Sequence, residues 1–209
     1  MFARFCTTAC SLAIATLALN GGAPTRANVF DTPLKPLPVA ERVALREGQP
    51  VLTEVAEGRY VARVLLEAPV ETVWDVLTDY GNYDEFLPNV VSSEITSNDG
   101  AQKTVEQVSV GRAFVFSKQA RSLSEIREKA LQQIDFRLLE GDLKTSRGSW
   151  KLDAFSTSLR GPDDLVLVTY TIEIDPGKTF SRGIFFNVFE EAIVDTLSAI
   201  TTEVETRLE

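Results

Sequence analysis

Histidine is absent from this chain of 209 residues, and the two cysteines, Cys6 and Cys10, both lie near the amino terminus. Zinc, haem and iron–sulfur sites usually take their ligands from histidine or cysteine, so none of these groups is expected. Catalysis by a Cys–His or a Ser–His–Asp constellation is excluded for the same reason. The sequence therefore predicts neither a cofactor nor a metal.

Positive charge is also scarce, with 21 basic residues against 30 acidic ones and a net charge of −9. Nucleic-acid affinity depends mainly on basic contacts to phosphates, so no nucleic-acid partner is expected. Anionic membrane surfaces would repel such a chain, although a transient membrane contact stays open as an alternative. A neutral apolar ligand fits this charge better than a phosphorylated one.

Long hydrophobic runs are missing too, because the apolar run at residues 5–19 is shorter than the roughly 20 residues of a membrane span. Residues 1–27 contain Arg4 and Arg26 but no acidic residue, and Thr25 and Ala27 place small side chains at −3 and −1 of a cut before Asn28. This pattern predicts a secretory signal peptide and an exported protein, in a periplasm, lumen or extracellular space. An uncleaved N-terminal membrane anchor and an organellar transit peptide are the alternatives.

Prolines at positions 33, 36, 38 and 50 mark residues 28–50 as a linker without an assigned function. A domain at residues 51–209 follows. After removal of the leader the mature chain would contain no cysteine, so it would tolerate an oxidising compartment without forming disulfides.

Alternating apolar residues predict strands at residues 51–67, 90–97, 101–116, 131–139, 149–155 and 165–174. Gly58 is expected at a turn or bulge, Asn98-Asp99-Gly100 at a hairpin, and residues 117–127 in a more exposed continuation of the sheet. A stripe with steps of three and four predicts a helix within residues 182–208. The stripe consists of Phe186, Phe189, Ile193, Leu197, Ile200, Val204 and Leu208. Many strands and one long terminal helix indicate an α+β fold.

Residues 68–88 combine an apolar helix face with an aromatic loop. The face consists of Val70, Val73, Trp74, Leu77 and Tyr80. The loop that follows is a hydrophobic segment and consists of Tyr83, Phe86, Leu87 and Pro88. This segment is too short to predict a helix. Two interpretations stay open: a core helix with its loop, or the rim of an apolar cavity.

This stretch also resembles a known family. The segment A-P-V-E-T-V-W-D-V-L-T-D-Y with the downstream F-L-P, E-G-D-L-K at residues 140–144 and G-S-W at residues 148–150 are similar to the START-like (SRPBCC) superfamily. The likeness is strongest to its polyketide cyclase/dehydrase and coenzyme Q-binding branch, and covers roughly residues 51–208. It implies a helix-grip fold, in which a curved antiparallel sheet wraps around a long C-terminal helix and leaves a hydrophobic tunnel.

Aromatic residues on the inward strand faces and the terminal helix are the candidate ligand contacts. The set is Tyr60, Phe114, Phe116, Phe136, Trp150, Tyr170, Phe186 and Phe189, with Ile193 from the helix. Arg112, in phase with Val108 and Val110, is the candidate for a ligand's polar end, together with the hydroxyls of Tyr60 and Tyr170. The alternatives are that the aromatics fill a core and that Arg112 bonds a nearby carboxylate or carbonyl.

Three functions remain open. The first is binding of a small hydrophobic ligand that resembles a lipid, quinone or polyketide. The second is a cyclase or dehydratase, with acid–base groups drawn from Asp79, Glu106, Tyr60, Tyr170 and Arg112. No two of these residues have a sequence spacing that indicates joint action. The third is an exported interaction module with an apolar groove. The sequence favours binding over catalysis and predicts no oligomeric state.

The leader generates a direct prediction. Intact-mass measurement on protein from its native host should give a chain that starts near Asn28, because the apolar run ends in a cleavable small-residue motif. A full-length mass recovered in the membrane fraction would contradict cleavage and favour the anchor.

Overall fold

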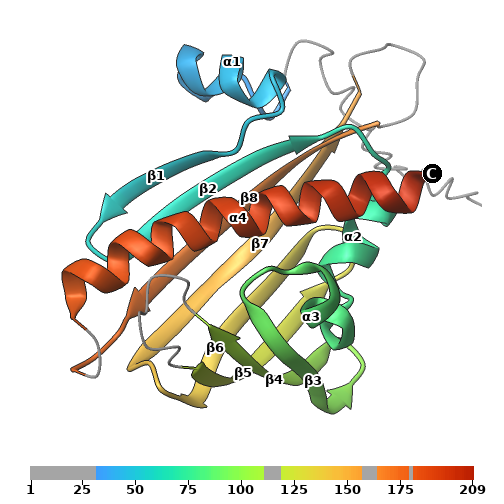
Figure 1. Ribbon diagram of the computed structural model, residues 1–209. Coiled ribbons are helices and arrows are strands. Elements are labelled where there is room, and N and C mark those ends of the chain that lie inside the picture. Colours follow the sequence, from blue (N-terminus) through green and yellow to red (C-terminus); the bar gives the residue numbers. More distant parts are fainter. Residues whose placement is uncertain (1–31, 111–118, 157–163, 179–180) are drawn as a thin grey trace, which may run out of the picture.

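The computed structural model describes residues 32–110, 119–156, 164–178 and 181–209. Its strands form one antiparallel sheet in the order β1-β2-β8-β7-β6-β5-β4-β3. The strands are β1 (Val51–Ala56), β2 (Arg59–Leu66), β3 (Val90–Asp99), β4 (Gln102–Val110), β5 (Gln119–Lys129), β6 (Gln133–Gly141), β7 (Thr145–Phe155) and β8 (Leu165–Asp175). The sheet curves around the long helix α4 (Arg182–Leu208), which confirms the α+β helix-grip prediction (Figure 1).

Two predicted turns are confirmed. Gly58 joins β1 to β2 with a φ of 72°, and a Cβ atom there would overlap the carbonyl oxygen of Ile174. Gly100 closes the β3–β4 hairpin with a φ of 63°. Both backbones lie in the left-handed region that favours glycine, so the turns fix where the strands reverse.

The inner face of β2 consists of Tyr60, Ala62, Val64 and Leu66, as the alternation predicts, and all four are buried. The register places Tyr60 opposite Ile172, Ala62 opposite Tyr170 and Val64 opposite Val168. Because β2 and β8 share this apolar face, they form the floor on which α4 packs.

Helix α4 buries Ile193, Leu197, Ile200 and Val204. It contacts β1, β2 and the helix α2 (Val70–Leu77). The predicted stripe is confirmed for these four residues and is wrong at its last position, because Leu208 is 47% exposed where the helix passes beyond the core.

After α2 the chain turns through η1 (Tyr80–Asn82) and α3 (Tyr83–Phe86). The prediction that Tyr83 and Phe86 lie outside any helix is wrong. The Leu87 N–H donates to the Tyr83 carbonyl at 2.8 Å, and this bond closes a single helical turn before Pro88.

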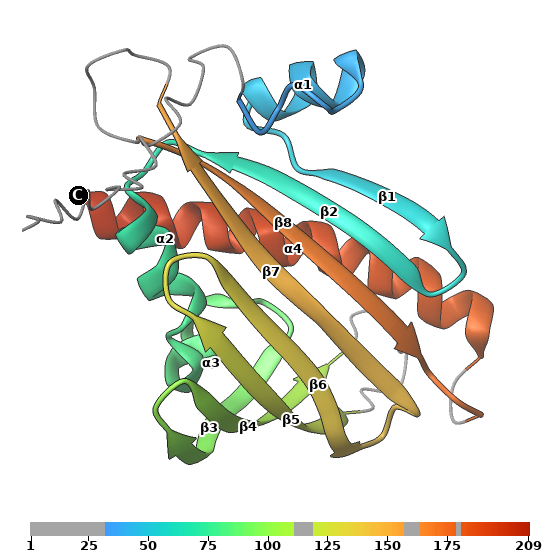
Figure 2. The same ribbon diagram turned by 180° about the vertical axis from the view of Figure 1, so that it is seen from behind.

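The linker predicted at residues 28–50 contains a helix, α1 (Val39–Arg46). Pro38 precedes its first turn, where a missing N–H costs nothing, so the prolines flank the helix instead of interrupting it. Leu34 and Leu45 pack on Leu167 at the outer face of the sheet. Helix α1 lies beside β1 and β2 (Figure 2). The predicted leader at residues 1–27 lies outside the described residues.

Strand β4 has a different inward phase from the one predicted. Val105 is 2% exposed and shares its face with Gln107 and Ser109. Val108, where the predicted row starts, therefore lies on the opposite strand parity, while Val110 at the end of β4 also lines the cavity. The further members of the row, Arg112, Phe114 and Phe116, lie outside the described residues. In the described part of the chain, no helix has the length and hydropathy of a membrane span.

The packing of α4 generates a stability prediction. Leu197→Ala should lower the free energy of unfolding by about 2–5 kcal/mol, because it leaves a cavity in a fully buried position. The matched control Leu208→Ala, on the same helix but exposed, should change it by less than about 0.5 kcal/mol. Equal losses from both variants in urea unfolding would contradict this packing.

Candidate ligand-binding cavity

A cavity of about 340 Å³ lies between the inner face of the sheet and α4. Strands β3 to β8 form its floor, while η1, α3 and α4 form its roof. Its apolar wall includes Leu87, Val105, Ile126, Ile134, Phe136, Trp150, Ile172, Phe189 and Ala192. The lining therefore comes from segments spread over most of the domain.

Three aromatic rings form a stack on the cavity floor. Trp150 lies 4.0 Å from Tyr170 between ring centroids with an interplanar angle of 24°. Phe136 lies 5.9 Å from the same ring at 22°. Stacked rings of this kind add stability beyond their buried area, so both neighbours help to hold the Tyr170 ring.

Gly148 makes room for this stack. It sits on β7 between Phe136 on β6 and Ile172 on β8. A Cβ atom at Gly148 would lie 2.7 Å from Cζ of Phe136 and would overlap the carbonyl oxygen of Thr171. The missing side chain lets the Phe136 ring cross β7 towards Tyr170, which gives the G-S-W segment a structural reason.

The structure brings four of the predicted contacts to the cavity wall: Phe136, Trp150, Tyr170 and Phe189. Three others lie elsewhere. Tyr60 is fully buried and donates its hydroxyl to Glu190 at 3.1 Å.

Phe186 lies against the Gly58 turn, with the Arg182 guanidinium 5.4 Å from its ring. Ile193 is 3% exposed within the core under α4. Neither side chain lines the cavity in the described structure.

Sequence reasoning missed the polar part of the wall. Gln107, Ser122, Ser124 and Ser146 face the cavity from β4, β5 and β7. The prediction that residues 117–127 form an exposed continuation is wrong for the inner face of β5. The alternation of Ala120, Ser122, Ser124 and Ile126 could have shown a continuous face, but polar residues on it resemble residues that face solvent.

Tyr80, Tyr83 and Leu87 also line the wall. Their placement agrees with the interpretation of the aromatic loop as the rim of a cavity. The Tyr80 hydroxyl donates to Glu128 at 2.9 Å, and Lys103 lies 2.6 Å from the same carboxylate. Tyr83 donates to the Leu77 carbonyl at 2.6 Å.

All four tyrosines of the chain have raised pKa values. Burial is the largest cause for each, because a phenolate loses hydration inside the fold. Hydrogen bonds to Glu190 and Glu128 further raise the pKa values of Tyr60 and Tyr80. Burial alone raises the pKa of Tyr170.

The candidate acid–base carboxylates are already engaged. Glu106 lies 2.7 Å from the Arg121 guanidinium, whose hydrogen bond holds the Glu106 pKa below its usual range. Asp79 accepts hydrogen bonds from Arg207 at 2.7 Å and from Asn82 at 2.8 Å.

Of the described wall residues only Arg121 carries a charge, and it also pairs with Glu140 at 3.1 Å. Among the described residues no three acidic side chains gather as metal ligands would. The wall therefore offers a neutral surface with hydroxyl and amide groups.

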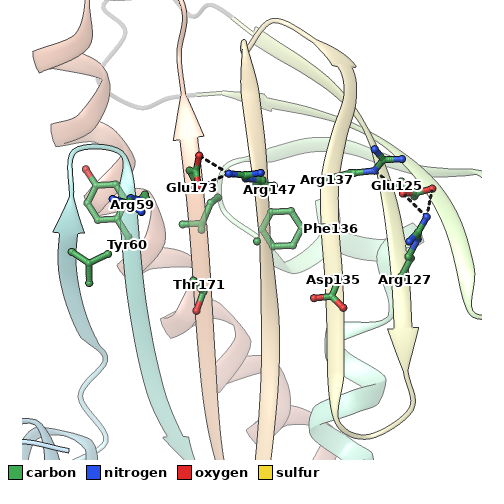
Figure 3. A pocket seen from close by; sticks show the side chains of 13 residues that line it. Arg59, Tyr60, Glu125, Arg127, Asp135, Phe136, Arg137, Arg147, Thr171 and Glu173 are labelled. Atoms are coloured by element: carbon green, nitrogen blue, oxygen red, sulfur yellow. Dashed lines mark hydrogen bonds and ion pairs between the residues drawn. The ribbon is translucent and has the colours of Figure 1, made fainter.

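A second hollow, of about 610 Å³, lies on the outer face of the sheet (Figure 3). Arg147 pairs with Glu173 at 2.9 Å and Arg137 with Glu125 at 2.7 Å, and the Arg137 hydrogen bond lowers the Glu125 pKa. These arginines are more than half exposed and already paired, so the hollow is a solvated row of ion pairs. The inner cavity is the better candidate site.

Comparison with known proteins agrees with this geometry. Residues 66–201 match the family model described as polyketide cyclase/dehydrase and lipid transport. The chain therefore belongs to this family. No curated protein matches the chain significantly.

Solved structures share the fold. The Zhui aromatase/cyclase from Streptomyces sp. R1128 superimposes with a TM-score of 0.61 at 20% identity, over 72% of this chain and 95% of that one. A STAR-related lipid transfer protein from Xanthomonas axonopodis gives 0.58 at 18% identity, over 75% and 98%. Human StAR-related lipid transfer protein 5 gives 0.58 at 11%, over 81% and 94%. Identities this low establish the likeness of the fold alone.

The tyrosine environments predict a displaced alkaline titration. A phenol ordinarily ionises near pH 10, but folding raises the pKa values of all four tyrosines. Their contribution to the free energy of unfolding is therefore fully present below pH 10 and falls progressively as the pH rises above it. Phenolate absorbance should appear at higher pH than in denaturant, together with loss of circular dichroism. A tyrosine that ionises near pH 10 in the folded protein would contradict this burial.

Proposed function

We propose that the protein binds a small, uncharged hydrophobic molecule in the cavity between the sheet and α4. The neutral wall carries this proposal, because Arg121, the one charged residue of the described lining, is already paired with Glu106 and Glu140. A charged ligand group would lose hydration there without gaining a free partner. Apolar sites with a few placed polar groups suit small hydrophobic molecules.

The family description supports this class of ligand, since it covers polyketide cyclisation or dehydration and lipid transport. The similar structures include an aromatase/cyclase and lipid transfer proteins. We favour binding without conversion, because Glu106 and Asp79 are engaged in ion pairs and the wall contains no histidine. Conversion of a bound polyketide that is lost in Tyr170→Phe would favour the cyclase alternative.

Binding is tested with the fluorescent apolar probe N-phenyl-1-naphthylamine. It should bind the folded protein saturably with one site per chain. The uncharged 1-dodecanol should displace it, whereas dodecyl phosphate at the same concentration should not, because the phosphate would be buried without a free cation. Absence of saturable probe binding would contradict the proposal.

A matched pair of variants on α4 locates the site. Ala192 faces the cavity, so Ala192→Phe should fill it and weaken probe binding by about tenfold or more. Val194 is 36% exposed on the same helix, and Val194→Phe should leave binding within about twofold. Equal effects of the two substitutions would place the probe outside the cavity.

A further inference from the structure

The Tyr170 hydroxyl is the one phenol group of the described structure that has no protein partner. Tyr60, Tyr80 and Tyr83 each donate to an acceptor, at 3.1, 2.9 and 2.6 Å respectively. Tyr170 lines the cavity, makes no hydrogen bond within the described residues and keeps accessible surface there. An unpaired phenol in the fold is destabilising unless the cavity contents bond it.

The position of this hydroxyl is fixed by its neighbours. Tyr170 lies between Ala62 on β2 and Trp150 on β7 in the strand register. The small Ala62 leaves room for the ring, while Trp150 and Phe136 stack on it at 4.0 and 5.9 Å. A donor on a ring held in this way selects a ligand by direction as well as by polarity.

A carbonyl oxygen is the group that best matches this donor. The oxygen lone pair of a neutral phenol is delocalised into the ring, so the hydroxyl donates a hydrogen bond better than it accepts one. A carboxylate or phosphate would need a free cation, which the described wall does not offer. A plain hydrocarbon would leave the hydroxyl unpaired once it had displaced water.

We propose that Tyr170 selects the ligand by donating a hydrogen bond to a carbonyl oxygen on a largely apolar, neutral skeleton. This inference rests on the proposed function and assigns its specificity to one residue. Trp150, Phe136 and Gly148 act as positioning residues, because they hold the phenol ring and make space for the stack. Tyr83 lines the same cavity, but its hydroxyl donates to the Leu77 carbonyl, so it does not select the carbonyl group of the ligand.

The test compares 9-fluorenone with fluorene, two rigid probes of nearly the same shape that differ by one carbonyl. Dissociation constants are measured for wild type, Tyr170→Phe and the matched control Tyr60→Phe, whose hydroxyl donates to Glu190 and does not line the cavity. Tyr170→Phe should reduce the preference for fluorenone over fluorene by about 3- to 10-fold, the effect of one neutral hydrogen bond. Tyr60→Phe should leave that preference within about twofold.

Infrared spectroscopy supplies a second readout that a purely structural role would not change. The carbonyl stretch of bound fluorenone should lie at lower frequency in wild type and Tyr60→Phe than in Tyr170→Phe, because a hydrogen bond weakens the C=O bond. Equal weakening of both probes by Tyr170→Phe, or an unshifted stretch, would overturn this inference and leave the binding function intact. Failure of both probes to bind wild type would overturn the binding function as well.

Discussion

One helix cannot cover the inner face of this sheet, and the rest of the structure follows from that constraint. Strands lie about 4.8 Å apart, so eight strands span about 34 Å, whereas a helix with its side chains is about 10–12 Å wide. Helix α4 contacts the β1–β2 side of the sheet, and η1 with α3 contacts β3 at the other edge (Figure 1). The part of the inner face between them stays uncovered and forms the wall of a cavity. The side chains on this wall determine which ligands the cavity can hold.

Small residues create this space and large ones shape it. Gly148 lets the Phe136 ring cross β7, and Ala192 leaves open volume under α4. Trp150 and Phe136 then fix the Tyr170 ring. The wall is consequently apolar over most of its area, its one charged residue in the described lining is paired, and the Tyr170 phenol lies on it at a fixed position without a hydrogen-bond partner among the described residues.

Alternation and helical periodicity predicted the elements because burial on one face leaves a period in the sequence. The same period cannot separate a core residue from a cavity residue: Tyr60 and Tyr170 are both inward, but only Tyr170 reaches the cavity. The serines of β5 were predicted to be exposed because a polar side chain towards a cavity looks like one towards solvent. The Phe136–Tyr170 contact across Gly148 depends on strand order, which the sequence does not state.

We propose that the inner cavity, and not the outer face of the sheet, holds the ligand. The most direct test is nuclear Overhauser spectroscopy of the methyl-labelled protein with bound fluorene. The account predicts contacts from the probe to methyl groups of Val105, Ile134 and Ala192, which line the cavity. Contacts confined to Val61 and Leu65, which share the opposite strand parity from the buried inner face of β2, would contradict it.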